Sequence, residues 1–116
     1  MKYQLTDETK IHEGIVLHRI QATKDFSDVK AGDLGGWVES TKNLSQLGMC
    51  WIFDASMCFE RGVVKSDARV KERSIVCGKA VACGNCRIME CSFLSGNALI
   101  CGNRHIRGRV ITERGK

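Results

Sequence analysis

The sequence lacks proline entirely, has only seven aromatic residues among 116, and contains no apolar run near the length of a membrane span. The absence of proline suits a backbone that is paired in β ladders, because proline cannot donate a ladder hydrogen bond. The first eight residues do not resemble a signal peptide. We therefore expect a cytoplasmic protein with no membrane contact, large enough for a single domain with a modest core.

The sequence also lacks the short motifs that carry common catalytic chemistry. It has no glycine-rich phosphate loop, no nucleophile elbow and no paired-carboxylate arrangement. These absences predict that the protein is not an enzyme and needs no cofactor.

A six-residue repeat runs from residue 50 to residue 112. Its third position is apolar in ten successive units, which read Ile52, Cys58, Val64, Val70, Val76, Ala82, Ile88, Leu94, Ile100 and Ile106. Its first position is small in nine successive units, which read Cys50, Ser56, Gly62, Ala68, Ser74, Ala80, Cys86, Ser92 and Ala98. Two columns at one period identify a repeat protein, in which each unit buries its apolar residue by stacking on its neighbours.

We interpret the repeat as a short parallel β-helix of triangular cross-section. Three units make one turn of 18 residues, so the repeat holds about four turns. Residues 1–43 lack the period, and the strand-like runs on either side of His12-Glu13-Gly14 predict a hairpin. The expected fold is all-β, a single structural domain with an N-terminal hairpin capping module over residues 1–43 and a β-helix over residues 44–116.

The run DFSDVKAGDLGGWV at residues 25–38, followed by CWIFD at residues 50–54, resembles the N-terminal segment of YdcK-like bacterial and prophage proteins. The resemblance is close over about residues 15–60 and extends more loosely through units such as GNALI at residues 96–100. It implies a left-handed β-helix of hexapeptide-type repeats. Because acyltransferases share this fold, the transferase label of such relatives rests on fold analogy.

Sorting outward positions at 18 residues places an apolar column on one face. The predicted interface residues are Met57, Phe59, Ile75, Phe93 and Ile111. Monomers rarely expose a contiguous apolar patch of this kind. We expect a homo-oligomer, in the first place a homodimer, or a host protein partner to cover it. The alternative is that the N-terminal segment folds back over this face.

A second face carries positive charge. Residues 1–60 have 6 Lys and Arg against 9 Asp and Glu, whereas residues 61–116 have 12 against 4. The predicted basic ladder consists of Arg69, Lys71, Arg87, His105 and Arg107. A solvated surface is the favoured interpretation, and an acidic protein partner is the next. Nucleic acid is disfavoured because no stacking aromatics are interleaved with the ladder beyond Trp51 and Phe53.

The seven cysteines are an odd number without an export signal, and several occupy inward columns. We therefore expect reduced packing residues. Cys83, Cys86 and Cys101 are the metal-ligand candidates, because Cys83 and Cys86 have zinc-knuckle spacing and Cys101 stacks on Cys83. However, zinc needs four convergent ligands, and Cys86 points inward, so no metal site is predicted. Cys83 and Cys101 could cross-link under oxidation.

Together these features favour a non-catalytic β-solenoid that binds a protein partner, of bacterial or phage accessory type. One alternative is a degenerate relative of the hexapeptide acyltransferases with residual small-molecule binding. The fold resembles that class, in which a histidine at a cleft between trimer subunits acts as general base, and the candidates here are His12, His18 and His105. A third alternative is binding of an anion or nucleic acid through the basic ladder.

Overall fold

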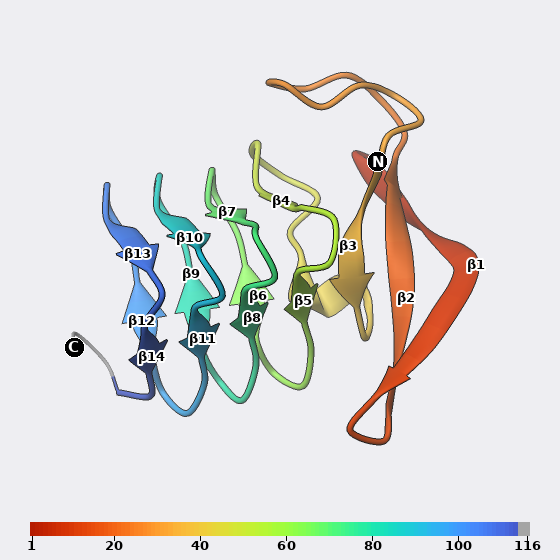
Figure 1. The fold of residues 1–116 in the computed structure, drawn as a ribbon. Coiled ribbons are helices and arrows are strands. Elements are labelled where there is room, and N and C mark those ends of the chain that lie inside the picture. The colour runs from red at the N-terminus through yellow and green to blue at the C-terminus, as the bar shows by residue number, and fades with distance from the viewer. Residues whose placement is uncertain (114–116) are drawn as a thin grey trace.

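The computed structural model describes residues 1–113, which are nearly all β-structure. An antiparallel hairpin begins the chain, and a stack of short parallel strands follows (Figure 1). The N-terminal elements are β1 (Tyr3–His12), β2 (Ile15–Ala22), β3 (Leu34–Val38) and the 3-10 helix η1 (Thr41–Asn43). The hairpin and its turn confirm the prediction for this segment.

The repeat forms three sheets that wind into a parallel β-solenoid of about four turns, as predicted. The four-stranded sheet contains β4 (Trp51–Ile52), β7 (Arg69–Val70), β10 (Arg87–Met89) and β13 (His105–Arg107). The three-stranded sheet contains β6 (Val63–Val64), β9 (Val81–Ala82) and β12 (Leu99–Ile100). The seven-stranded sheet joins β1, β2 and β3 to β5 (Met57–Cys58), β8 (Ile75–Val76), β11 (Phe93–Leu94) and β14 (Val110–Ile111).

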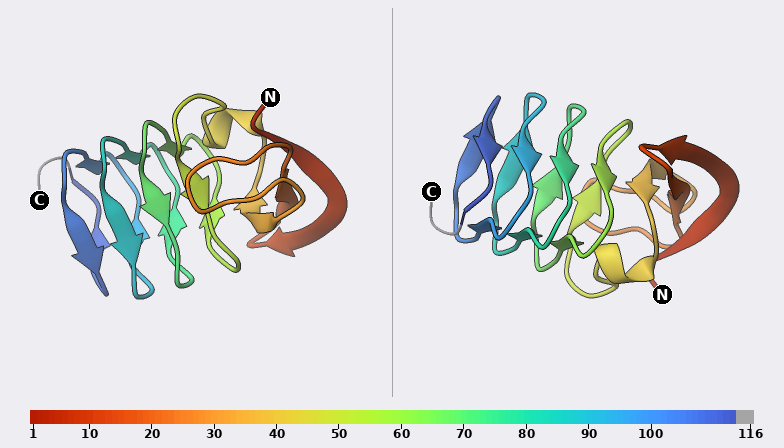
Figure 2. Two further views of the ribbon diagram at one scale, coloured as in Figure 1. Left: turned by 90° about the horizontal axis from the view of Figure 1, so that it is seen from above. Right: turned by 90° about the horizontal axis from the view of Figure 1, so that it is seen from below.

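The strands pair at the predicted spacing of 18 residues through most of the stack. Arg69 lies between Trp51 on one side and Arg87 on the other, and His105 follows Arg87. The coils therefore stack side by side along one axis (Figure 2). The inward third-position residues and the small first-position residues are buried, most of them with no exposed surface. Apolar burial along the axis is the main force that holds the coils together.

The corners depend on one backbone conformation. The fifth position of every unit from residue 54 to residue 108 has a positive φ, whether or not the residue is glycine. Its non-glycine occupants are Asp54, Glu60, Ser66, Glu72 and Glu90. Two of their carboxylates accept hydrogen bonds from the next coil: Glu60 from the Gly78 amide at 2.9 Å and Glu72 from the Glu90 amide at 3.0 Å. These bonds help to offset the left-handed conformation.

The N-terminal end of the stack is closed by the segment that lacks the repeat. Strand β2 pairs antiparallel with β3, and β3 pairs parallel with β5, so parallel stacking begins before residue 44. The Tyr3 ring lies edge-on to Trp51 at 6.3 Å, and its hydroxyl donates to the Leu44 carbonyl oxygen at 2.6 Å. Asn43 Nδ2 donates to the carbonyl oxygens of Glu60 and Gly62. These contacts give the first coil a partner on its outer side.

The last coil departs from the predicted register. Phe93 pairs with Val110 and Leu94 with Ile111, so the spacing here is 17 residues. The unit between Ile106 and Ile111 has lost one residue, and Ile111 points inward with 3% of its surface exposed. The prediction that Ile111 faces outward is therefore wrong. The shorter unit buries an isoleucine where the six-residue register would have placed Thr112, which favours the observed register.

Within residues 1–113, the structure contains no helix long and apolar enough to cross a membrane.

Candidate functional site: a charged corner hollow beside two partly covered faces

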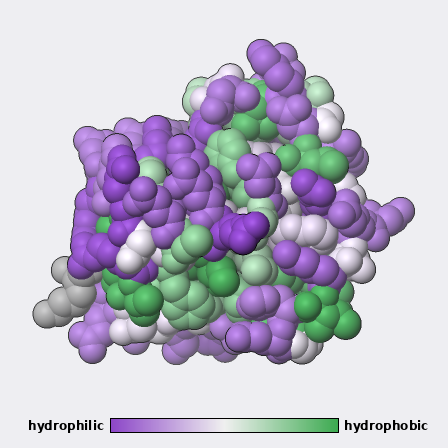
Figure 3. Space-filling view, in the orientation of Figure 1, coloured by the Kyte–Doolittle hydropathy of each residue, from purple (hydrophilic) through white to green (hydrophobic). Residues whose placement is uncertain are grey.

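The outward side of the seven-stranded sheet carries an apolar strip, which we define as Met57, Ile75, Phe93 and Val110. The first three side chains are partly buried, whereas Val110 is 73% exposed. Apolar surface is visible over β5, β8, β11 and β14 in the lower part of the space-filling view (Figure 3). The strip replaces the predicted column, with Val110 in the place of Ile111.

The hairpin covers the N-terminal part of this face. Leu17 and Trp37 form a cluster with Phe59 and Cys77, and all four side chains are buried. The ring of His12 lies 5.4 Å from the Phe59 ring. Phe59 was predicted as an interface residue, but it is 2% exposed. The alternative of intramolecular cover therefore describes this part of the face, while Val110 at the other end stays bare.

The residues of the basic ladder stack as predicted, but the first of them, Arg69, is already bound to another segment of the chain. We call residues 23–33 the N-terminal loop; it extends over the first coils (Figure 2). The buried Arg69 guanidinium donates to Asp28 at 2.7 Å and to the Ser27 hydroxyl at 2.6 Å. The hydrogen bond from Arg69 holds the pKa of the Asp28 carboxyl below its usual value, and Lys71 acts in the same direction. Arg69 is therefore a tether for the loop.

The other ladder residues are more accessible. Arg87 donates to the Asn85 carbonyl oxygen at 3.1 Å, and Arg107 lies 3.8 Å from Glu90. Lys71 is partly buried, whereas His105 and Arg107 are exposed. Charge of this kind is compatible with a solvated face or an anionic ligand.

The cysteines divide into a bonded pair and separate thiols. Cys83 and Cys101 are stacked with Cα atoms 4.6 Å apart, and the structure joins them in a disulfide. The sequence favoured reduced cysteines but allowed a cross-link for this pair, because parallel neighbours at one register position approach within disulfide range. Cys86 is buried in the core, where burial raises the pKa of its thiol to about 11. It does not converge with Cys83 and Cys101, and residues 1–113 contain no cluster with metal-ligand geometry.

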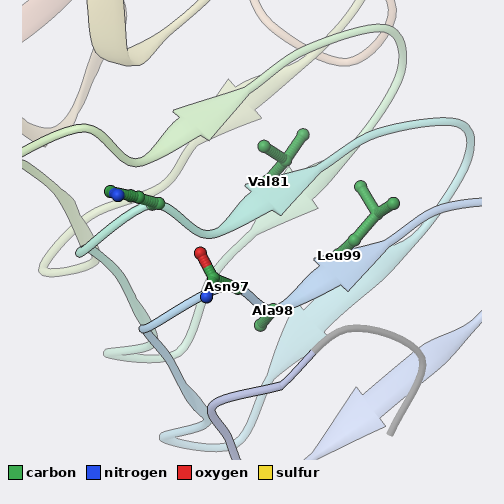
Figure 4. A pocket seen from close by; sticks show the side chains of 5 residues that line it. Val81, Asn97, Ala98 and Leu99 are labelled. Atoms are coloured by element: carbon green, nitrogen blue, oxygen red, sulfur yellow. The ribbon is translucent and has the colours of Figure 1, made fainter.

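Two hollows of similar size lie on corners of the solenoid. The first has a volume of about 480 Å³ and is lined by Lys79, Val81, Asn97, Ala98 and Leu99. Val81 and Leu99 project to the same side from the neighbouring strands β9 and β12 (Figure 4). The hollow combines two aliphatic side chains with the Lys79 amine and the Asn97 amide. We call it the β9–β12 hollow.

The second hollow also has a volume of about 480 Å³. Most of its lining residues carry charged side chains, so we call it the charged corner hollow. It is lined by Phe53, Asp54, Ala55, Lys71, Glu72 and Arg73. The lining comes from two successive coils, because β4 pairs with β7 at the 18-residue register. Two basic residues, two acidic residues and one aromatic residue therefore line one concave site of a size typical of small-molecule sites.

Several contacts fix the walls of the charged corner hollow. The Arg69 guanidinium lies 5.3 Å from the centre of the Phe53 ring, and Arg69 is in turn tied to the N-terminal loop. One oxygen of Glu72 accepts from the Glu90 amide, which orients the carboxylate. Phe53 and Glu72 are thus held in place before any ligand arrives.

The three histidines lie in different environments. His12 contacts Phe59 and lies 4.0 Å from Glu13, while His18 is paired with Val38 within the seven-stranded sheet. His105 is exposed on β13, two strands from β7. Among the three, His105 is on the sheet that borders the charged corner hollow.

Sequence reasoning identified Phe53 and Lys71 as outward residues but did not combine them with Asp54, Glu72 and Arg73. It sorted only the second and fourth positions of each unit, and these three residues occupy the fifth and sixth positions. The 18-residue register itself contained the signal, since it stacks Asp54 on Glu72 and Ala55 on Arg73. The contact between Asp28 and Arg69 could not be predicted from the repeat, because Asp28 lies outside it.

Comparison with known proteins gives one informative likeness. No family model matches the chain. In an alignment of 93 residues that covers 72% of the chain, the chain is 32% identical to a protein of Escherichia coli (strain K12) named "Uncharacterized acetyltransferase YdcK". It spans 28% of that relative's length.

This likeness and the parallel β-solenoid fit an acetyltransferase-like family of hexapeptide-repeat proteins. The resemblance to YdcK-like proteins drawn from the sequence is supported to that extent. The prediction that the protein is not an enzyme is contradicted by the name of this relative. That prediction rested on the absence of short catalytic motifs from the sequence.

Proposed function

We propose that this chain is an acetyltransferase-like β-solenoid that binds a phosphate-bearing thioester, such as acetyl-CoA, at the charged corner hollow. The observation that carries the proposal is the convergence of Lys71, Arg73 and the Phe53 ring in one hollow of about 480 Å³. The likeness to a protein named as an acetyltransferase supports the choice of donor.

Each part of such a donor has a matching group. Lys71 and Arg73 can pair with phosphate oxygens, and a guanidinium can bind two of them at once. Phe53 offers a ring face or edge to a heterocyclic base. The Arg69 contact fixes that ring, so less rotational freedom is lost on binding.

The hollow also contains a proton acceptor. In acetyl transfer, an acceptor nitrogen or oxygen attacks the carbonyl carbon, the carbon–sulfur bond breaks, and a base removes the proton of the attacking group. Glu72 has one oxygen fixed by the Glu90 amide and a second that can take that proton. We therefore assign Glu72 as the general base. The predicted candidate His105 lies two rungs of about 4.8 Å further along the axis.

Calorimetric titration with acetyl-CoA tests donor binding. Lys71→Ala and Arg73→Ala should each weaken binding about tenfold or more, since a hydrogen bond to a charged group contributes roughly 1.5–3 kcal/mol. Lys65→Ala is the matched control, because Lys65 is an exposed cation outside the lining of this hollow. Equal affinities in all four proteins, or no binding to the unsubstituted chain, would remove the proposal.

A second observation supports self-association of the chain. The apolar strip continues from the hairpin-covered cluster to the exposed Val110, so a second copy could extend an apolar contact that the molecule already makes. We propose that two copies pair through Phe93 and Val110. For the other expected partners, an acidic protein or a host protein, residues 1–113 show no comparable contact that a partner could extend.

Light scattering with size-exclusion chromatography tests this pairing. The unsubstituted chain should elute as a dimer, and Phe93→Glu should be monomeric, because a carboxylate would be desolvated at the interface. Leu99→Glu makes the same change on the three-stranded sheet and should stay dimeric. A monomeric unsubstituted chain, or a Phe93→Glu dimer, would contradict the pairing.

A further inference from the structure

Lys2 is a buried amine at the N-terminal end of the stack, with 1% of its surface exposed. Its Nζ donates to the Cys50 carbonyl oxygen at 2.8 Å and lies 3.2 Å from Cys50 Sγ and 3.4 Å from the Gly48 carbonyl oxygen. The Phe26 ring lies 5.1 Å away. Within residues 1–113, no carboxylate forms an ion pair with Lys2.

The sulfur partner is equally enclosed. Cys50 has no exposed surface, and its other neighbours are carbonyl oxygens. The Sγ atom lies 3.5 Å from the Ser45 oxygen and 3.7 Å from both the Leu47 and Val64 oxygens. An amine and a thiol thus lie in contact at one buried point, joined from residues 48 positions apart in the chain.

The surroundings favour the neutral forms of both groups. Burial lowers the pKa of the Lys2 ammonium, with an opposing effect from Cys50, and burial raises the pKa of the Cys50 thiol, with an opposing effect from Lys2. Arg69 also lowers the pKa of Lys2, while Asp67 raises it. A neutral amine has the free lone pair that bond formation at nitrogen requires.

We propose that Lys2 and Cys50 form a covalent nitrogen–oxygen–sulfur bridge when the protein meets peroxide. The first peroxide oxidises the thiol to a sulfenic acid and releases one water. The amine, the sulfenic acid and a second peroxide then give the Lys–NH–O–S–Cys bridge and two waters. The two peroxides each accept two electrons, one pair from sulfur and one from nitrogen, and the S–H bond and one N–H bond are replaced.

The geometry favours a bridge through one oxygen atom. The separation of 3.2 Å is much longer than a direct nitrogen–sulfur bond, whereas a single inserted oxygen needs only a small approach of the two atoms. Peroxide can reach the thiol if the turn over residues 45–49 opens. Leu47 and Met49 in this turn are exposed, and the turn carbonyls contact the sulfur directly.

The bridge would fasten the first strand to the first coil. The Lys2 amine otherwise holds this end through hydrogen bonds to the Gly48 and Cys50 carbonyl oxygens, and its backbone pairs with the Gln46 side chain and the Thr23 amide. A cross-link that closes a loop of this length restricts the unfolded chain and stabilises the folded one. Peroxide would then cross-link the N-terminal segment covalently to the first coil of the solenoid.

Peptide mass spectrometry after peroxide treatment tests the bridge. The unsubstituted chain should yield the Lys2 and Cys50 peptides linked, with the summed mass increased by one oxygen and decreased by two hydrogens, and a thiol reductant should separate them. Lys2→Arg retains hydrogen-bond donors but lacks the primary amine. Cys50→Ala removes the thiol and places alanine at a first position of the repeat, where Ala68, Ala80 and Ala98 also occur. Neither variant should form the link.

Melting temperatures provide a second measurement. Peroxide should raise the melting temperature of the unsubstituted chain but not that of Lys2→Arg or Cys50→Ala, and reductant should reverse the rise. Unlinked peptides in the unsubstituted chain, with Cys50 either free or oxidised to a sulfinic acid, would overturn the proposal and leave Lys2 as a backbone cap. A linked mass without the added oxygen would overturn the bridging atom.

Discussion

The first coils and the last coils are built from the same six-residue unit but have different neighbours. At the first coils, Tyr3 covers Trp51, the N-terminal loop binds Arg69, and the hairpin buries Phe59. At the last coils, Val110 is 73% exposed and His105 is also exposed. Within residues 1–113, no strand pairs with the outer edges of β12, β13 and β14. The repeat therefore sets the scaffold, and the segment without the repeat decides which outward residues remain available.

The largest expected effect comes from opening the covered end. Tyr3→Ala removes a fully buried ring and its hydrogen bond to Leu44, and should lower the free energy of unfolding by about 3–5 kcal/mol. His105→Ala removes an exposed side chain of the last coils, outside the proposed dimer contact, and should change it by no more than about 0.5 kcal/mol. Urea unfolding measures both. Similar losses in the two variants would mean that the N-terminal segment does not seal the stack.

Two glycines at equivalent corners sharpen the comparison. A Cβ at Gly84 would lie 2.5 Å from the Gly102 nitrogen of the next coil, whereas a Cβ at Gly102 meets no atom within 4 Å. Both have positive φ, so Gly102→Ala should cost about 1–2 kcal/mol in the free energy of unfolding. Gly84→Ala should cost about 1–3 kcal/mol more, because its neighbour is backbone that cannot move away. If thermal or urea unfolding shows that both variants lose the same free energy of unfolding, then the backbone of the next coil does not lie as close to Gly84 as the structure shows.

A smaller effect is expected at the tether of the N-terminal loop. The pKa of Asp28 is lowered in the fold, so its contribution is complete above the ordinary value of 3.8 and is lost as the pH falls through the lower folded value. Phe26 of this loop lies 5.3 Å from the Trp51 ring, so release of the loop should change tryptophan fluorescence below pH 3.8. Asp28→Asn should lose this acid transition. A transition that persists unchanged in Asp28→Asn would assign it to another carboxylate.

The repeat columns predicted the parallel solenoid and its pairing through Ile106, because burial at a fixed period imposes register on every coil. The prediction failed at Ile111 because the last unit is one residue shorter than the others. A six-residue period alone does not indicate where a unit of different length occurs. The hairpin in residues 1–33 was predicted and its cover of the apolar face was an alternative, but the individual contacts of this segment could not be predicted, for a different reason. The contacts of Asp28 with Arg69 and of Leu17 with the Phe59 cluster join distant positions, and neither segment has a period that marks its partner.

The charged corner hollow shows what periodic reasoning can and cannot locate. Its stacking of Asp54 on Glu72 follows from the 18-residue register, so the site could have been assembled from the sequence. The concavity could not, because it depends on how the corner side chains and the Arg69 contact fill the space around Phe53. Fold class was therefore accessible from composition and period, while function depended on the shape of one corner.

The most direct test of the account is a map of amide chemical shifts during titration with acetyl-CoA. We expect the amides of Phe53, Asp54, Lys71, Glu72 and Arg73 to shift, with those of Val81 and Leu99 unchanged. Shifts confined to the β9–β12 hollow around Val81 and Leu99, or none in either hollow, would contradict the central claim that the charged corner hollow binds the donor.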